Sequence, residues 1–160
     1  MIASLLVATL LSGALPPGAP ADLICTVTRI VDGDTFYCDR HVKVRLIGID
    51  APEQDQGPFG RESMVALRAL IPPGTLVRLE RDVDAKDRFG RRLAYVWADG
   101  SLVNEAMVRG GWALLFTVPP NVKYADRLGR AQTAARNARA GLWRENGFAC
   151  APVAWRRHRC

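Results

Sequence analysis

The sequence predicts a single α+β domain that is rich in β-structure, and three observations support this fold class. The chain has 160 residues, which is long enough for one domain with a proper core. Five segments read as strands, mostly from the alternation of apolar and polar residues. One helical segment lies between the third and fourth strands, and two follow the fifth. This order is that of a five-stranded OB-type Greek-key barrel with three helices.

The first three strands are expected at the start of the domain. Residues 23–31 (LICTVTRIV) alternate and contain many β-branched side chains. The Asp32-Gly33 pair that follows predicts a hairpin turn, because both positions tolerate positive φ. Strands over 35–39 and 41–49 come next. Asp50-Ala51-Pro52 ends the third strand, because proline cannot continue the hydrogen-bond ladder.

Apolar spacing and helix-ending residues indicate three helices, and alternation indicates two more strands. The first helix has Met64, Leu67 and Ile71 at helical spacing and stops at Pro72-Pro73-Gly74. The last helix is expected to end with Gly141 as its C-cap. One face of this helix carries Leu128, Ala131, Ala135 and Ala138. The expected ranges are 61–71, 102–109 and 123–140 for the helices, and 75–81 and 92–98 for the strands.

The N-terminal segment 1–21 contains no charged residue and differs in composition from the rest of the chain. Its apolar run is shorter than the ~20 residues that a membrane span needs. Ala19-Pro20-Ala21 resembles a cleavage site, so we expect a secretory signal peptide. No Lys or Arg precedes the run, which leaves an uncleaved anchor or a misplaced start codon open. The expected organisation is a signal peptide over 1–21, a folded domain over 22–143 and a basic, cysteine-containing tail over 144–160 packed on that domain.

The formal net charge is +6, and arginine carries most of the positive charge, because only three lysines are present. Arginine can bind a phosphate with two parallel hydrogen bonds, which suits a nucleic-acid partner. An arginine-rich composition can equally reflect the base composition of a gene. Net charge alone therefore indicates only nonspecific attraction.

The four cysteines fit an oxidising compartment. Cys25 and Cys38 lie in the two arms of the first hairpin, nearly opposite one another, and Cys150 and Cys160 lie in the tail. Of the three pairings that four cysteines allow, we expect Cys25–Cys38 and Cys150–Cys160, because both close short loops. Free thiols in a cytosolic protein are the alternative. The chain has no CxxC motif and only two histidines, so zinc is not favoured.

Three segments combine carboxylates with arginines, and each is placed where a strand ends or turns. Carboxylate oxygens suit a hard divalent cation, arginines suit a phosphate, and a glutamate between them could activate a water molecule. Such a site would cut a phosphodiester bond. No histidine lies near these segments, which excludes a histidine-based nuclease mechanism. The segments are Asp32-Gly33-Asp34-Thr35, residues 45–53 (RLIGIDAPE) and residues 87–91 (DRFGR).

These motifs resemble the staphylococcal nuclease (thermonuclease) family. The resemblance continues from the third motif through residues 92–100 and 103–109, extends more weakly to Gly141-Leu142-Trp143, and covers roughly residues 23–143. It implies an SNase-like OB-fold barrel with added helices over the domain 22–143. It also implies a metal-dependent nuclease with its catalytic residues intact.

Asp34, Asp50 and the backbone carbonyl of Ala51 are the candidate ligands of a calcium ion. Calcium takes about six to eight oxygen ligands, so these three would form part of a cage that waters and substrate phosphate complete. Asp34 could instead only cap its turn, and Asp50 could be a polar strand end that meets solvent. Asp32 is the better turn-forming residue and is given that structural role.

Glu53 is the candidate general base, and Arg45 and Arg91 are the candidate phosphate ligands. Glu53 would take a proton from the attacking water, and the arginines would stabilise the charge that builds on the phosphate oxygens. An exposed loop glutamate is the structural alternative for Glu53. Arg45 could merely pair with a carboxylate. Arg91 is preferred over Arg88 and Arg92 because it matches the Gly-Arg pair of the family.

Aromatic positions depart from the family pattern. Phe89 replaces a tyrosine, and Trp112 and Phe116 stand where the family has paired tyrosines. Trp112 and Phe116 could stack on bases, but we expect both in the core. The tail segment Trp155-Arg156-Arg157-His158-Arg159 is either a nucleic-acid contact or a tail pinned by Cys160.

The leading hypothesis is a secreted or periplasmic, calcium-dependent nuclease. It would hydrolyse single- and double-stranded DNA and RNA with little sequence specificity. It is expected to be a monomer with no stable protein partner and no membrane attachment after signal cleavage. A second hypothesis is a catalytically silent OB-fold module that only binds nucleic acid. A third is a periplasmic interaction domain.

Overall fold

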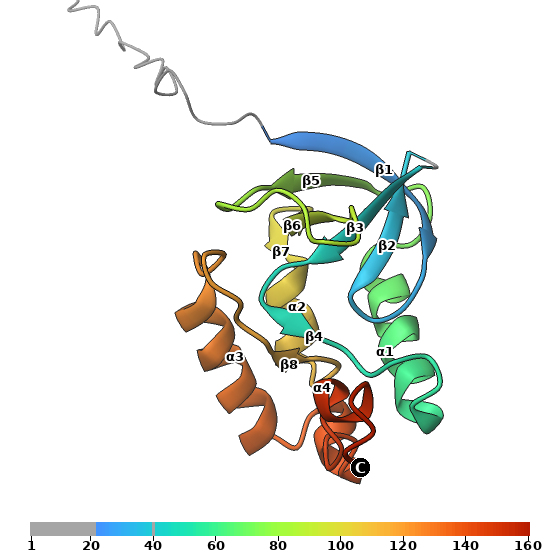
Figure 1. Ribbon diagram of the computed structural model, residues 1–160, viewed down its shortest axis with the longest axis vertical. Coiled ribbons are helices and arrows are strands. Elements are labelled where there is room, and N and C mark those ends of the chain that lie inside the picture. Colours follow the sequence, from blue (N-terminus) through green and yellow to red (C-terminus); the bar gives the residue numbers. More distant parts are fainter. Residues whose placement is uncertain (1–21, 40) are drawn as a thin grey trace, which may run out of the picture.

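The computed structural model describes residues 22–39 and 41–160 (Figure 1). The predicted signal peptide over 1–21 lies outside the described residues. In the described part, no helix has the length and apolar character needed to cross a bilayer.

Five strands form the predicted closed barrel. They are β1 (Leu23–Ile30), β2 (Thr35–Cys38), β3 (Val42–Leu46), β5 (Leu76–Glu80) and β6 (Arg92–Ala98). Neighbours along the order β3-β2-β1-β5-β6 pair in antiparallel fashion, and a parallel pairing of β3 with β6 closes the barrel. β7 (Ser101–Leu102) turns back and pairs with the end of β6 in antiparallel fashion. The fold class is therefore confirmed as an α+β barrel of the OB type.

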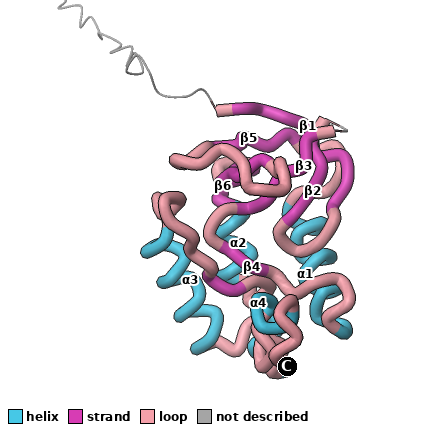
Figure 2. The backbone as a smooth tube through the Cα atoms, viewed as in Figure 1, coloured by secondary structure: helices cyan, strands magenta, loops and turns pink. Residues whose placement is uncertain are grey.

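The three predicted helices are present, and the tail adds two short ones. The helices are α1 (Gly57–Leu70), α2 (Val103–Arg109) and α3 (Ala125–Asn137), and the short ones are the 3₁₀ helix η1 (Gly141–Glu145) and α4 (Pro152–Trp155). Figure 1 and the tube in Figure 2 show the barrel at one end of the molecule and the helices at the other. The C-terminal tail folds back against the body of the molecule, where α4 lies near β4 and β8 (Figure 1).

The third strand is shorter than the sequence predicts. It ends at Leu46 because Gly48 adopts a left-handed conformation (φ 78°), which turns the chain out of the barrel. A separate strand, β4 (Ile49–Asp50), then pairs with β8 (Leu114–Leu115) in a second small sheet. This pairing places Asp50 opposite Leu114, outside the barrel ladder.

Helix boundaries also differ from the prediction, and α3 begins at Ala125 rather than at residue 123. α1 begins at Gly57 rather than at residue 61, with Pro58 in its first turn, where proline costs no hydrogen bond. α3 ends at Asn137, and the left-handed residue after it is Arg139 (φ 49°), so the predicted Gly141 C-cap is wrong. Gly141 instead starts η1, and Ala138 is exposed rather than buried.

The core fills the barrel and continues between the barrel and the helices. Its largest members include Phe36, Leu46 and Leu79 from the strands, and Met107 and Leu128 from the helices, all buried. Buried Asn104, in α2, joins the two parts, because it accepts a hydrogen bond from Val96 N and donates one to the Ile47 carbonyl. Asn104 therefore attaches α2 to β6 and to the segment that follows β3.

Both expected disulfides are present in the structure. Cys25–Cys38 ties β1 to β2 inside the core, and Cys150–Cys160 closes a ring in the tail. The second bond fixes the ring that contains α4, which matters for the cleft described next.

Candidate active site

The turn between β1 and β2 presents two aspartates with different tasks. Asp32 accepts a hydrogen bond from Asp34 N (2.9 Å), so it stabilises the turn as expected. Gly33 is required for space and not for positive φ, since a Cβ there would lie 1.8 Å from Ser63 Oγ on α1. The physical reason that the sequence offered for this glycine is therefore wrong, although the turn is where it was predicted.

Asp34 is buried and connects three segments. Its Oδ1 accepts a hydrogen bond from Thr35 Oγ1 (2.9 Å) and lies 3.0 Å from Arg45 Nε. Its Oδ2 accepts a hydrogen bond from Ala51 N (2.8 Å). The turn aspartate thus reaches across to the segment that follows β4, and it brings Ala51 beside the predicted ligand pair.

Arg45, on β3, holds the loop and still faces the cleft. Its Nη1 donates to the carbonyls of Leu46 (2.6 Å) and Ile49 (2.8 Å), and its Nη2 donates to Asp50 Oδ1 (3.2 Å). A guanidinium has five N–H donors, so one Nη2 hydrogen is left for a ligand. Arg45 is therefore both the carboxylate partner and a group that can reach a phosphate.

Asp50 is the last residue of β4, and Glu53 lies in the loop after β4, beyond Ala51-Pro52. Asp50 is only 2% exposed, whereas Glu53 is partly exposed. The backbone N–H of Glu53 donates to Gln56 Oε1 (3.3 Å), which anchors this part of the loop to the start of α1. Glu53 is in contact with solvent beside the buried Asp34 and Asp50, so it could take a proton from a water molecule there.

Arg156, from the tail, enters the site, and sequence analysis did not single it out. Its Nη1 donates to Asp50 Oδ1 (3.0 Å) and Glu53 Oε1 (2.7 Å), and its Nη2 donates to Asp50 Oδ2 (2.9 Å). The one signal in the sequence was the cluster of arginines before Cys160. That cluster did not indicate which arginine would point into the cleft.

Two acidic side chains of the site, Asp32 and Asp50, have raised pKa values. Burial raises the pKa of Asp50, and the hydrogen bond from Arg156 and the charge of Arg45 offset only part of this effect. Burial, followed by the nearby charge of Asp34, raises the pKa of Asp32 to about 7. Burial by itself would lower the pKa of Arg156, but its hydrogen bonds with Asp50 and Glu53 raise it. Desolvation and nearby negative charge thus oppose ionisation of Asp32 and Asp50.

Arg91 approaches the same cleft from the loop before β6. Asp87 accepts hydrogen bonds from Phe89 N, Arg91 N and Arg91 Nε, the last at 2.6 Å. Burial alone would raise the pKa of Asp87, but the Arg91 hydrogen bonds and charge lower it. Because Asp87 holds Arg91 by Nε, the two terminal amino groups can bind a phosphate.

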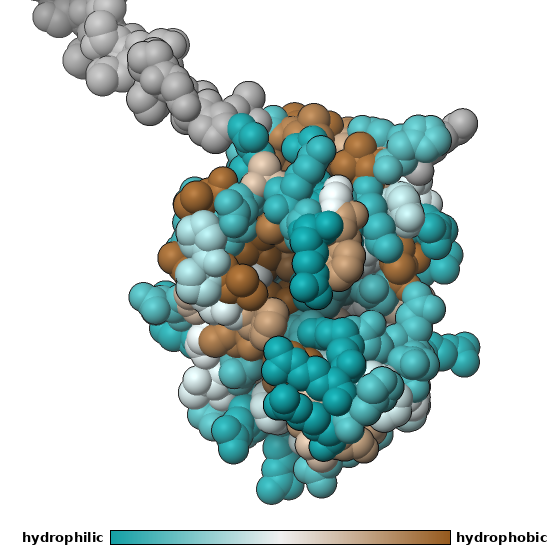
Figure 3. All heavy atoms as spheres, viewed as in Figure 1, coloured by the Kyte–Doolittle hydropathy of each residue, from teal (hydrophilic) through white to brown (hydrophobic). Residues whose placement is uncertain are grey.

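These residues line one cleft of about 730 Å³. Figure 3 shows hydrophilic residues gathered over the tail on the same face. The lining is strongly charged and includes every predicted catalytic and metal-binding residue. Its members are Asp32, Asp34, Lys43, Arg45, Asp50, Ala51, Glu53, Arg88, Phe89, Arg91, Phe116, Val153, Arg156 and Arg157.

A smaller pocket of about 190 Å³ adjoins the cleft and shares Arg45, Arg91 and Phe116 with it. Its other walls are mostly apolar. Phe116 is 36% exposed, so the expected core position is wrong for this residue, whereas Trp112 packs against the core. The β4–β8 pairing explains the difference, because it leaves the chain after Leu115 at the rim of the cleft.

The carboxylates suit a hard divalent cation. Asp34 and Asp50 are both buried, share Arg45 as a partner and offer only oxygen donors, as calcium prefers. In the described residues, the only group of three acidic, histidine or cysteine side chains with ligand atoms within 4.8 Å of one another is Cys25, Cys38 and Asp39. Its cysteines form a disulfide, so it is not a metal site. A cation in the cleft would therefore have two side-chain ligands, with Glu53 set apart from them.

Comparisons with known proteins point to one family. A family described as "Staphylococcal nuclease homologue" matches residues 43–145. The chain is 36% identical over 125 residues to a thermonuclease of Staphylococcus hyicus, covering 73% of each chain. It is 34% identical over 125 residues to a thermonuclease of Staphylococcus intermedius, covering 73% of this chain and 74% of that one. An endonuclease of Bacillus subtilis is 32% identical over 133 residues, covering 77% of this chain and 63% of that one. Arg45, Asp50, Glu53 and Arg91 lie inside the matched range 43–145, while Asp34 and Arg156 lie outside it.

Proposed function

Because the chain belongs to the staphylococcal nuclease family, we propose that it is a secreted or periplasmic, calcium-dependent nuclease of DNA and RNA with little sequence specificity. Its general activity, hydrolysis of phosphodiester bonds, follows from the family and from its thermonuclease and endonuclease relatives. Calcium, substrate breadth and location are the proposed parts.

One observation carries the proposal: Asp34, Arg45, Asp50, Glu53 and Arg91 line a single cleft. They come from the first turn, from β3, from β4, from the loop after β4 and from the loop before β6. A structural role for each residue alone would not require them to share a solvent-facing surface. Their convergence supports one reaction centre with acids, a base and phosphate ligands.

Arg45 and Arg91 would hold the scissile phosphate from two sides. Arg45 has an Nη2 hydrogen to spare, and Arg91 is held by Asp87 through Nε, so both present N–H groups that are already oriented. Donors that are fixed before the reaction stabilise the charge that develops on the phosphate oxygens without a cost of reorganisation. The two arginines would therefore favour the transition state more than the ground state.

Glu53 would act as the general base. Its side chain is partly exposed at the cleft, so it can meet a water molecule, and its backbone is fixed by Gln56. As a carboxylate it would accept the proton of the attacking water and lead the oxygen toward the phosphorus atom.

Asp34, Asp50 and the carbonyl of Ala51 would hold the calcium ion. When bound, the ion would supply Lewis-acid polarisation of a phosphate oxygen and a fixed position for the substrate. The two buried carboxylates would provide the negative charge that attracts the ion. Burial raises the pKa of Asp50, so its ionised form is unfavourable without a cation. A divalent cation would remove that electrostatic cost.

The open, arginine-rich cleft supports a broad substrate range. Side chains that bind phosphate contact the part of the polymer that all sequences share. The names of the Staphylococcus relatives denote thermonucleases, and that of the Bacillus relative an endonuclease. The two disulfides support an oxidising location.

The test is the Glu53→Gln substitution, assayed on single-stranded DNA with calcium and with a chelator. We expect cleavage to fall by about 10²–10⁴-fold, the usual contribution of a general base, with an unchanged circular dichroism spectrum. The matched control is Glu145→Gln, because Glu145 is exposed and does not line the cleft. Near-normal activity of Glu53→Gln would remove the proposed mechanism. Retention of intact DNA by the wild type, without cleavage, would favour the silent binding module.

A further inference from the structure

The tail places a positive charge on the acids of the cleft. Arg156 binds both oxygens of Asp50 and one oxygen of Glu53. We propose that Arg156 occupies the cation position on Asp50 in the metal-free protein, so that the tail sets the metal affinity of the site. This inference rests on the proposed function, because it requires Asp50 to be a metal ligand.

The two cations would need the same oxygens. Arg45 and Arg156 together engage both carboxylate oxygens of Asp50, and Asp50 is almost completely buried. A divalent ion that took both oxygens of Asp50 would have to displace Arg156, because Oδ1 already accepts two hydrogen bonds, Oδ2 accepts one from Arg156, and two positive charges repel at short range. Binding of the ion and the contact of Arg156 are therefore mutually opposed, and removal of one strengthens the other.

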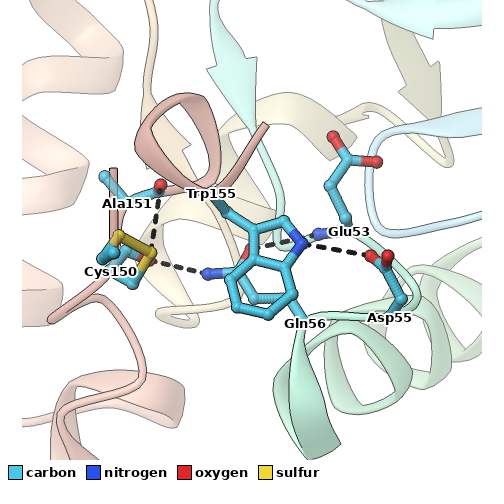
Figure 4. The surroundings of a disulfide bond; sticks show 7 residues. Glu53, Asp55, Gln56, Cys150, Ala151 and Trp155 are labelled. Carbon is cyan, nitrogen blue, oxygen red and sulfur yellow. Dashed lines mark hydrogen bonds between the residues drawn. A yellow bond between two sulfur atoms is a disulfide. The ribbon is translucent and has the colours of Figure 1, made fainter. Parts of the chain in front are cut away.

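The position of Arg156 is enforced by the tail and not by chance contact of a free end. The Cys150–Cys160 disulfide closes a ring around α4. Gln56 Nε2 donates to the Cys150 carbonyl (2.6 Å) while Gln56 Oε1 accepts from Glu53 N, so one buried amide joins the ring to the base (Figure 4). Trp155 Nε1 donates to Asp55 Oδ1 (3.2 Å) as a second link, also drawn in Figure 4.

The neighbouring arginines do not share this role. Arg157 lines the cleft but forms no ion pair with Asp50 or Glu53, and Arg159 does not line the cleft. The contact is thus specific to one side chain. When Arg156 leaves Asp50, the ring keeps it at the cleft wall, where it adds to the positive charge that faces a polyanion.

The experiment measures calcium binding to the metal-free protein by isothermal titration calorimetry, without substrate. We expect Arg156→Gln to lower the Kd for calcium by about tenfold, because charge-assisted hydrogen bonds to Asp50 no longer have to be broken. Arg159→Gln removes the same charge from the same tail and should leave the Kd unchanged. An unchanged or higher Kd for Arg156→Gln would overturn the inference.

Asp50→Asn separates this inference from the proposed function. If calcium binding is lost in Asp50→Asn and Arg156→Gln still has the wild-type Kd, only the role of Arg156 fails. If Asp50→Asn binds calcium as the wild type does, the metal site itself fails, and the role of Arg156 fails with it. The tether is tested by a Cys150→Ser, Cys160→Ser variant, which we expect to lower the Kd about two- to threefold, because the Gln56 and Trp155 contacts remain. A wild-type Kd in that variant would show that the disulfide is not what holds Arg156.

Discussion

Two clusters of carboxylates and cations lie on this small domain, and they differ in how well their charges are satisfied. At the end of β5, one acid, Glu80, accepts hydrogen bonds from Trp97 Nε1 (2.6 Å), from Tyr124 OH (3.1 Å to each oxygen) and from Lys123. In the cleft, Asp34, Asp50 and Glu53 share two arginines, Arg45 and Arg156.

The pKa values follow this difference. Burial alone would raise the pKa of Glu80, but the hydrogen bonds from Lys123, Trp97 and Tyr124 outweigh it and lower the pKa. Burial raises the pKa of Asp50 despite its two arginines. A carboxylate whose hydrogen bonds outweigh its desolvation stabilises the fold. A carboxylate whose desolvation is not fully offset destabilises the fold until a ligand supplies positive charge. The cluster that is worse for stability is the one suited to function.

The largest expected contrast concerns activity. Asp50→Asn should reduce DNA cleavage roughly 1,000-fold, because a bound metal supplies several kcal/mol of transition-state stabilisation. Steady-state cleavage of single-stranded DNA at saturating calcium measures this loss. The control, Glu80→Gln, removes an acid of the other cluster and should keep the rate within about twofold. Equal losses in both variants would abolish the distinction between a functional and a structural cluster.

The second contrast concerns stability. Glu80→Gln should lower the free energy of unfolding by about 1–3 kcal/mol, since Lys123 and the aromatic donors lose a charged acceptor. Urea unfolding followed by tryptophan fluorescence at pH 7 measures the change. Asp50→Asn should cost less, because neutralisation also removes an unfavourable buried charge. A larger loss in Asp50→Asn than in Glu80→Gln would reverse our interpretation of the two clusters.

The smallest contrast concerns pH. The pKa of Glu80 is lowered in the folded protein, so its ionised form stabilises the fold above the unfolded-state value. This stabilisation is lost as pH falls through the lowered folded-state pKa. In a series from pH 6 to pH 3, the difference in unfolding free energy between wild type and Glu80→Gln should therefore hold down to the ordinary glutamate pKa of 4.5 and shrink below it. A series of urea titrations across this range tests it, and a constant difference would contradict the electrostatic origin.

Local sequence determined the scaffold. Alternation over 92–98 predicts β6 to the residue, and the strands over 23–31 and 75–81 are correct to within one residue at each end. These periodic patterns report which side of a segment is buried, and such information is local. The motif residues could also be predicted from the sequence. Once the strand order is known, the segments around Asp34, Asp50 and Arg91 are expected to meet, and all three residues line one cleft.

Contacts between segments far apart in the sequence complete the site. Arg156 contacts Glu53, although 103 residues of sequence separate them. Gly33 is required because Ser63, on α1, packs against it. α4 has four residues, which is too short for a helical period, and its position depends on a disulfide and on one buried glutamine. Contacts of this kind arise from the packing of whole elements against one another. The motifs therefore indicate which chemical groups this protein brings to the cleft, and the fold determines which charges meet there.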